Sequence, residues 1–356
     1  MPRTYSVRNS QAEIYYERGL DRSRCKQYRE AVFCYKRAAD QHHADAQYNL
    51  ALIYHTGKPG VNKNYQLAAK WYQKAADKGC IEALTNLGVL YSDGLGVKQN
   101  KETAFKLYLK AANQGSLIAA FNVAAMYTKG EGIKQDLKKA YFWWKKLAEN
   151  DHKEAQYRLG RMYECGDGVE KNEKQACEWY FKAVDQGHVS ASNNLGYMFS
   201  KGYGVPMSDQ AALRCWETAV REGDHVVASY NLGQVYEHGW GVEQNLTEAH
   251  KWYLKAANKD YTNAQFSLGL MFEEGRGVSK DIEQALKWYR IAAENHHTNA
   301  IDKVVNLERK LASQDTFDNT QTSILAEMAT KFHDLVMAEP LDSTVEESNI
   351  SKKKLT

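Results

Sequence analysis

The sequence predicts an all-α solenoid, that is, a stack of antiparallel helix pairs, and two observations carry the prediction. One motif, Ala, Leu-Gly, Tyr or Phe, Gly-x-Gly-Val and then Ala-x-x-Trp-Tyr-x-x-Ala-Ala, recurs with substitutions every 36 or 37 residues along the 356-residue chain. Fixed periods of about 20–50 residues are typical of stacked supersecondary units. Within each copy, two apolar stripes with helical spacing lie on either side of the glycine turn. The copies begin at Ala46, Ala83, Ala119, Ala155, Ala191, Ala228 and Ala264, and a partial copy begins at Ala300.

The copy that begins at Ala83 shows how the motif predicts its two helices. Ala83, Leu87 and Leu90 have the spacing that places them on one face of a helix. Gly94 and Gly96 follow, and glycine readily takes the left-handed conformation that ends a helix. A second helix and a short loop complete an antiparallel hairpin. The apolar face of that second helix comprises Ala104, Leu107, Tyr108, Ala111 and Ala112, and Gly115 ends it.

Small and large residues at fixed positions of the motif predict how the helices pack. A glycine inside a helix costs about 1 kcal/mol relative to alanine, so its repeated use indicates that a neighbouring helix passes too close for a side chain. Aromatic pairs such as Trp71-Tyr72 and Trp179-Tyr180 are expected in the core between layers. The glycines are Gly88, Gly160, Gly196, Gly233 and Gly269.

This pattern closely resembles the Sel-1-like repeat, a relative of the tetratricopeptide repeat, without a break over residues 46–299. The resemblance implies a right-handed α-solenoid whose members act mostly as adaptors in protein complexes. Residues 11–45 look like a more tetratricopeptide-like opening repeat. The seven Sel-1-like repeats are expected at residues 46–82, 83–118, 119–154, 155–190, 191–227, 228–263 and 264–299.

The two ends of the chain depart from the motif. Residues 1–10 are expected to be flexible, residues 300–313 to form the capping helix that a solenoid needs, and residues 314–321 to form a polar linker. An amphipathic helix is predicted for residues 322–339, followed by a disordered tail at 340–356. In one interpretation that helix packs on the last repeat as part of the cap. In the other it occupies the groove or binds a partner.

Composition and charge argue against a nucleic-acid-binding protein and against a membrane-spanning one. Apolar residues make up 43% of the chain, the mean hydropathy is −0.65 and the net charge is only +3. No basic stripe stands out, and no apolar run reaches the roughly 18 residues of a membrane span. The first residues lack the apolar core of a secretory signal. We therefore expect a cytoplasmic monomer whose six cysteines are reduced and buried.

The third position of each copy is the best candidate for a ligand-contacting ridge. By analogy with tetratricopeptide repeats, the first helix of each pair lines the concave face, so its positions outside the motif point at a ligand. Aromatic residues, which lead interface hot spots, occupy these positions except at Thr85 and Asn193. In the alternative interpretation the aromatics only stiffen contacts between successive first helices. They are Tyr48, Phe121, Tyr157, Tyr230 and Phe266.

Two further rows lie on the same predicted helices. The tenth position becomes acidic toward the C-terminal repeats, at Glu164, Glu237 and Glu273, so a basic segment would be favoured there. The fourth position is often asparagine, which offers both donors and an acceptor to an extended peptide backbone. A structural hydrogen bond is an equally good interpretation of these side chains. They are Asn49, Asn86, Asn122, Asn194 and Asn231.

The sequence predicts no catalytic, cofactor-binding or metal site. The Gly-x-Gly-Val turns follow predicted helices and lack the strand and the third glycine of a dinucleotide loop. Histidines recur three residues before the first alanine of several copies, but successive layers lie about 10 Å apart, too far for two of them to share a zinc ion. Cysteine-rich family members linked to β-lactam hydrolysis carry paired cysteines in every repeat, and this chain does not. The histidines are His43, His152, His188, His225 and His297.

Together these observations predict a non-enzymatic scaffold or adaptor that binds a protein or peptide on its concave face. One alternative is a translocated or secreted bacterial regulator that acts on host proteins, because Glu346-Glu347 and Lys352–Lys354 hint at a C-terminal signal. The other alternative is a hydrolase of the cysteine-rich Sel-1-like type.

Overall fold

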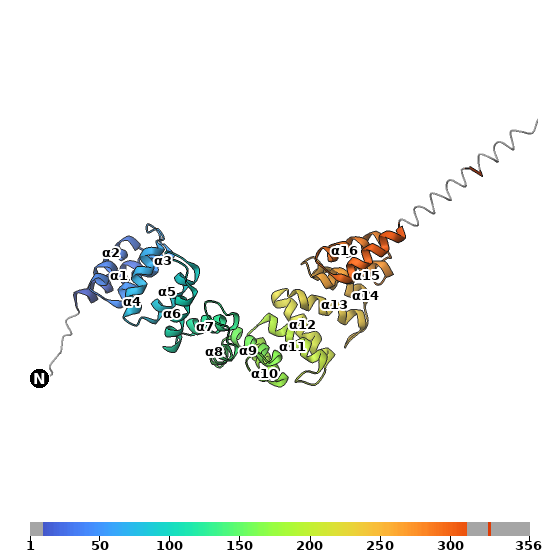
Figure 1. Ribbon diagram of the computed structural model, residues 1–356, viewed down its shortest axis with the longest axis horizontal. Coiled ribbons are helices and arrows are strands. Elements are labelled where there is room, and N and C mark those ends of the chain that lie inside the picture. The colour runs from blue at the N-terminus through green and yellow to red at the C-terminus, as the bar shows by residue number, and fades with distance from the viewer. Residues whose placement is uncertain (1–9, 312–326, 329–356) are drawn as a thin grey trace, which may run out of the picture. The chain divides into compact units, whose positions relative to one another are not determined.

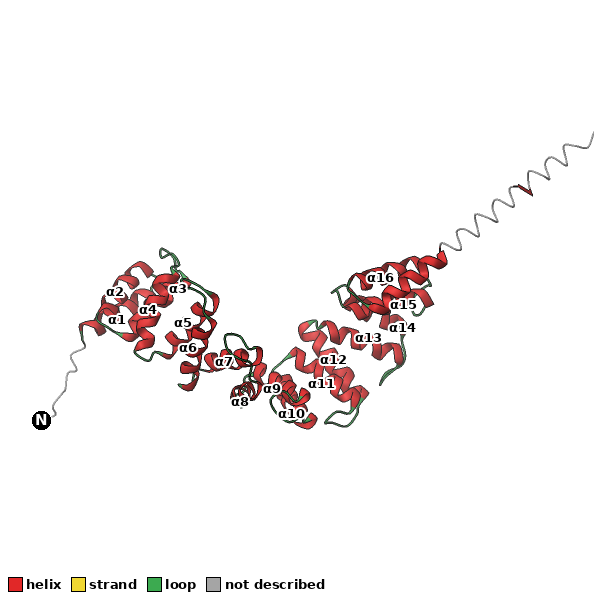
Figure 2. Cartoon of the chain, in the orientation of Figure 1, coloured by secondary structure: helices red, strands yellow, loops and turns green. Residues whose placement is uncertain are grey.

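The computed structural model describes residues 10–311 and 327–328 (Figure 1). Within them the chain forms helices and loops and no named strand, which confirms the all-α prediction (Figure 2). A further helix begins at residue 298 and is described as far as residue 311. The named helices are α1 (Gln11–Arg24), α2 (Tyr28–Asp40), α3 (Ala44–Thr56), α4 (Tyr65–Asp77), α5 (Ile81–Asp93), α6 (Lys101–Asn113), α7 (Leu117–Lys129), α8 (Leu137–Ala148), α9 (Lys153–Cys165), α10 (Glu173–Asp185), α11 (Val189–Lys201), α12 (Asp209–Gly223), α13 (Val226–His238), α14 (Leu246–Ala257), α15 (Thr262–Glu274) and α16 (Ile282–Glu294).

From α1 to α13, and again from α14 to α16, helices that follow one another in the chain pack against each other. The two helices of a pair do so, as α3 and α4 show, and the second helix also packs against the first helix of the next pair, as α4 and α5 show (Figure 1). This is the arrangement of an α-solenoid. The chain divides into two compact units, Met1–Gln244 and Asn245–Thr356.

Side-chain caps mark the start of most of the named helices, as α9 and α10 illustrate. The Nδ1 atom of His152 accepts a hydrogen bond from the amide of Ala155 at the start of α9. Gly166 ends the helix in the left-handed conformation, as the glycine turn predicts. Asn172 then caps α10 by accepting from the amide of Gln175 at 3.0 Å. Such caps satisfy backbone donors that a helix terminus leaves unpaired.

A glycine inside the first helix faces an aromatic ring of the second helix at Gly88, Gly160, Gly196 and Gly269, which is the close approach that the sequence predicts. A Cβ atom added at Gly160 would lie 2.7 Å from the Tyr180 ring, so the close approach excludes a side chain. The tyrosine of the aromatic pair is fully buried in several copies. The preceding tryptophan is buried at Trp71 and Trp143 but half-buried at Trp179, so the core prediction holds better for the tyrosines.

The second glycine of each turn connects successive repeats. Gly132 has a φ of +73°, and a Cβ atom there would lie 2.6 Å from the backbone carbonyl carbon of Lys101. Lys101 begins the second helix of the preceding pair. The Gly-x-Gly turn therefore packs its backbone directly onto a helix start, which is a structural use of glycine.

The six cysteines are free thiols, and the expectation that they are buried is wrong for two of them. Cys177 is buried, whereas Cys25 and Cys165 are exposed. Cys25 is the C-cap of α1 and Cys165 is the last residue of α9. Both therefore sit at helix ends, outside the face that packs.

At the C-terminal end, the predicted capping helix begins at residue 298, two residues before the predicted start. Leu307 and Ala300 are buried on it, and the Lys303 ammonium pairs with Glu273 at 2.7 Å. The predictions for residues 1–9, the linker at 314–321 and the tail at 340–356 fall outside the described residues. So does the predicted 322–339 helix, except for residues 327 and 328, which are helical and exposed. No helix within the described part of the chain has the length and apolar character needed to cross a membrane.

Candidate functional site

The third-position aromatics lie between successive repeats. The Tyr157 ring stacks on the imidazole of His188, the residue that caps α11 of the next helix pair, with centroids 4.5 Å apart, and it tilts against Tyr180 of α10 at 6.0 Å. Phe266 makes the same stack on His297, and Phe121 makes a tilted contact with His152. All of these third-position rings are half-buried. Their packing supports the alternative interpretation, in which they stiffen contacts between repeats.

The recurring histidines are helix N-caps, a role that the sequence analysis missed. The Nδ1 atom of His188 accepts a hydrogen bond from the amide of Ala191 at 3.2 Å. The ring proton therefore sits on Nε2, which donates to the Glu154 carboxylate at 2.9 Å. We call Tyr157, His188 and Glu154 the stacked joint. The same cap occurs at His43, His152, His225 and His297, and Ser116 takes this role in one copy.

Tyrosine hydroxyls bind the tenth-position and asparagine side chains. The Tyr180 hydroxyl donates to Glu164 and accepts from Asn194 at 3.1 Å. Burial, and then the bond to Glu164, raises the pKa of Tyr180. The Tyr289 hydroxyl likewise donates to Glu273 at 2.6 Å. In these copies the predicted contact residues therefore hydrogen-bond to buried tyrosines inside the stack.

Other predicted contacts have varied surroundings. The Asn86 amide donates to the Tyr72 hydroxyl at 3.2 Å, and the Asn122 amide donates to the carbonyl of Ile118 at 3.1 Å. Three further predicted contacts are half-buried on the first helices: Tyr230, Asn231 and Glu237. The Asn231 amide donates to the Asn193 side chain at 3.3 Å, and the Tyr230 hydroxyl accepts from Gln234 at 3.2 Å.

One joint departs from this pattern, because small side chains replace the aromatic and the histidine. Thr85 occupies the third position, and the next helix is capped by Ser116. Their hydroxyls lie 3.3 Å apart. We call Thr85 and Ser116 the open joint. The preceding cap position also lacks histidine, since Cys80 stands there and makes no side-chain cap bond.

The open joint leaves a cleft of about 510 Å³, which we call the α5 cleft. Its walls come from α3, α5 and the start of α7. Two of its residues, Tyr48 and Asn86, are contacts predicted from the sequence, and Thr85 is one of the two exceptions to the aromatic row. The rim is apolar, with Ile118 exposed to 71% and Leu117 to 43%. The other lining residues are Ile81, Glu82, Val89, Gln114, Gly115 and Ser116.

The α5 cleft is electronegative at one end. Glu82 is its only charged lining residue among those described. The Cys80 thiol donates to the Glu82 carboxylate at 3.5 Å, and burial, together with the carboxylates of Glu82 and Asp45, raises the pKa of that thiol. The helices α3 and α5 contain no lysine or arginine.

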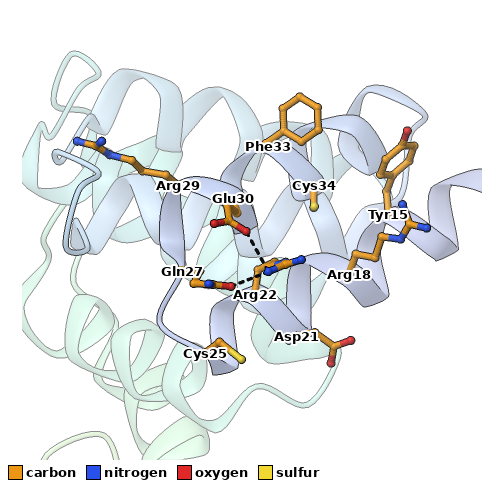
Figure 3. Close-up of a pocket in the computed structure, with 10 residues that line it drawn as sticks. All are labelled: Tyr15, Arg18, Asp21, Arg22, Cys25, Gln27, Arg29, Glu30, Phe33 and Cys34. Carbon is orange, nitrogen blue, oxygen red and sulfur yellow. Dashed lines mark hydrogen bonds and ion pairs between the residues drawn. The ribbon is translucent and has the colours of Figure 1, made fainter.

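A second cavity, of about 590 Å³, lies on the first helix pair (Figure 3). Cys34 lines it at the position where later copies carry the tryptophan of the aromatic pair. Arg22 pairs with Glu30 at 3.1 Å and donates to Gln27 at 2.8 Å, as the dashed lines in Figure 3 show. Arg29 donates to the carbonyl of Gly60 at 2.9 Å. Since Arg22 and Arg29 are paired within the protein, this face fits the polar outer surface that the first repeat of a solenoid presents to solvent.

Known proteins share this repeat. The sequence model described as "Sel1 repeat" matches residues 12–43, 44–80, 81–116, 117–152, 153–188, 189–224, 226–261 and 262–297. These matches start two residues before the predicted copies and include the opening pair, which the sequence analysis treated as tetratricopeptide-like.

Solved structures give the same result. The chain is similar to a Sel1 repeat protein from Oxalobacter formigenes, with 28% identity, a TM-score of 0.66, and coverage of 83% of this chain and 86% of that chain. It is also similar to c5321, a protective antigen present in uropathogenic Escherichia coli strains, with 24% identity, a TM-score of 0.48, and coverage of 95% and 89%. No relative was found among curated proteins. With eight matching repeats over residues 12–297, the chain belongs to the Sel1 repeat family.

Proposed function

We propose that this chain is a non-enzymatic scaffold that binds a protein or peptide partner along the face formed by its first helices. Sel1 repeat proteins are generally protein–protein interaction scaffolds. The finer claim concerns the face, and one observation carries it. The α5 cleft opens on that face, and its lining includes Tyr48, Thr85 and Asn86.

The chemistry of the cleft supports this proposal. Binding sites are typically concave and mostly apolar, with a few placed polar groups. Here Val89, Ile81 and Ile118 supply apolar surface, and Asn86 and Glu82 supply polar groups. An isoleucine exposed to 71% gains stabilisation when a partner covers it, because burial of apolar surface is favourable at about 25 cal/mol per Å².

In this proposal the repeats with a stacked aromatic contribute less surface to partner binding. Phe121, Tyr157 and Phe266 already pack against histidines, so a ligand would meet only their exposed edges. Tyr230 belongs to the same row, is half-buried and accepts a hydrogen bond from Gln234 at 3.2 Å, and it is part of the proposed face. The cytoplasmic location stays a prediction from the sequence.

Site-specific photo-crosslinking tests this proposal. Benzoylphenylalanine placed at Ile118 in the full chain, in the cells that produce it, should form adducts with a discrete protein partner. The matched control places the same group at Lys70, which is exposed on the second helix α4, and should give little or none of that adduct. Equal adducts at both positions, or adducts only at Lys70, would contradict binding along the first helices.

A further inference from the structure

We propose that the α5 cleft binds an apolar side chain of a peptide segment, and that a lysine or arginine two or three residues away in the peptide pairs with Glu82. This inference rests on the proposed scaffold function and specifies the ligand chemistry of its site. Three steps support it: the origin of the cleft, the arrangement of groups on α5, and the charge around them.

The cleft occupies the place where other copies put their own aromatic and imidazole. At the stacked joint those rings fill the space between repeats, with centroids 4.5 Å apart. At the open joint Thr85 and Ser116 stand in the same two positions. The helices there keep the 13-residue length found at the stacked joint, so the two joints differ in their side chains and not in the length of their helices. A cleft of this origin suits an apolar or aromatic group supplied from outside.

The groups that line the cleft from α5 form one face of that helix. Glu82, Thr85, Asn86 and Val89 are spaced i, i+3, i+4 and i+7, and residues at such spacings are neighbours on a helix surface. Glu82 lies about 10 Å from Val89 along the helix axis, since each residue rises 1.5 Å. An extended peptide covers about 3.3–3.6 Å per residue. An anchor held between Thr85 and Val89 therefore places a residue two or three positions away next to Glu82.

Charge complementarity selects a cation at that place. The Glu82 carboxylate lines this end of the cleft and accepts a hydrogen bond from the Cys80 thiol at 3.5 Å. The walls formed by α3 and α5 carry no lysine or arginine to neutralise it. Since Glu82 is an exposed residue, its pairing with a peptide cation contributes specificity and association rate more than affinity. The apolar anchor supplies most of the affinity.

The test is a selection from a random 12-residue peptide phage library on the intact chain. Thr85→Phe combined with Ser116→His restores the aromatic and imidazole of the stacked joint and fills the cleft. The matched control is Asn193→Tyr, which places an aromatic at the third position of another repeat, where the following helix is capped by His225, away from the cleft. Thr85→Phe alone is the second filled variant, and circular dichroism verifies that each variant is folded.

Recovered peptides should combine an apolar residue with a lysine or arginine two or three positions away. Their synthetic forms should bind the filled variants at least about tenfold more weakly, as expected for loss of an anchor. Glu82→Gln should weaken them roughly threefold, the size of an exposed ion pair, and Asn193→Tyr should leave affinity unchanged.

Three outcomes would overturn the proposal. Peptides that bind the filled variants as well as the original chain would refute the cleft and leave the scaffold function standing. Peptides that lack a basic residue, or that are insensitive to Glu82→Gln, would refute the cation pairing. Recovery of no binder together with no adduct at Ile118 would count against the scaffold function itself.

Discussion

The stacked joint and the open joint occupy equivalent places in the same solenoid and differ in what fills them. At the stacked joint, Tyr157 packs on His188, which also caps α11 and binds Glu154. At the open joint, Thr85 and Ser116 preserve only the cap and one hydroxyl contact. Beneath both joints a buried tyrosine of the second helix remains, Tyr180 at the stacked joint and Tyr108 at the open joint. A repeat can therefore give up a stabilising contact at one joint and gain a surface there.

The energies involved explain why such a loss is tolerated. A stacked aromatic pair contributes about 0.5–1.5 kcal/mol beyond its buried area, and an N-cap contributes about 1 kcal/mol. The open joint keeps the cap, through the Ser116 hydroxyl and the Ala119 amide. It lacks the stack, the apolar area that the two rings bury and the hydrogen bond from the imidazole to a carboxylate, while the core that each repeat buries against its neighbours remains.

The largest effect is expected from the core below the stacked joint. Tyr180→Ala should lower the free energy of unfolding by about 3–5 kcal/mol, because it removes a fully buried ring and leaves Glu164 and Asn194 without its hydroxyl. Urea denaturation followed by circular dichroism measures the loss. Met207→Ala, at a residue exposed to 68%, is the control and should change stability by less than about 0.5 kcal/mol. Similar losses in the two variants would contradict this account of the joint.

A middle-sized effect separates the two joints directly. His188→Ala should cost about 2 kcal/mol, since it removes the cap and the stack on Tyr157 together. Ser116→Ala at the open joint should cost about 1 kcal/mol, since it removes a cap with no stack. The same denaturation experiment compares them. If Ser116→Ala proves as costly as His188→Ala, the stack contributes nothing to stability.

The smallest effect is a dependence on acid. The hydrogen bond from His188, with further contributions from Arg158, holds the pKa of Glu154 below its ordinary value. A carboxyl whose folded pKa is depressed adds stability above its unfolded pKa of about 4.3 and loses that stability as the pH falls further. Glu154→Gln should therefore flatten the fall in melting temperature between about pH 5 and pH 3. The open-joint variant Ser116→Ala, which removes no carboxyl, should retain the full acid dependence.

The fold was predictable because it repeats. The spacing of Ala83, Leu87 and Leu90 encodes a helix locally, and the glycine turns encode where each helix ends. The histidine caps were visible as a fixed offset before each first alanine. Their role was missed because a cap depends on where Nδ1 points relative to a backbone amide, which periodicity does not encode.

The cleft was only partly predictable. Tyr48 and Asn86 were selected from the sequence, whereas Ile118 and Glu82 were not. The departure at Thr85 is plain in the sequence, but its consequence depends on Ser116, which lies 31 residues later and meets it only in the folded stack. Contacts of this kind come from the packing of neighbouring repeats, so no single copy of the motif contains them.

The α5 cleft draws its walls from three consecutive repeats, and this has a consequence for how such a surface arises in evolution. Tyr48, Thr85 and Ile118 lie in the repeats at 44–80, 81–116 and 117–152. Gene segments that encode single repeats can be duplicated or deleted without loss of the solenoid, because each repeat contacts only its neighbours. Deletion of residues 81–116 would then preserve the architecture and erase the cleft. A single repeat can therefore be lost without loss of the architecture, whereas the proposed recognition surface is kept only when three consecutive repeats are inherited together.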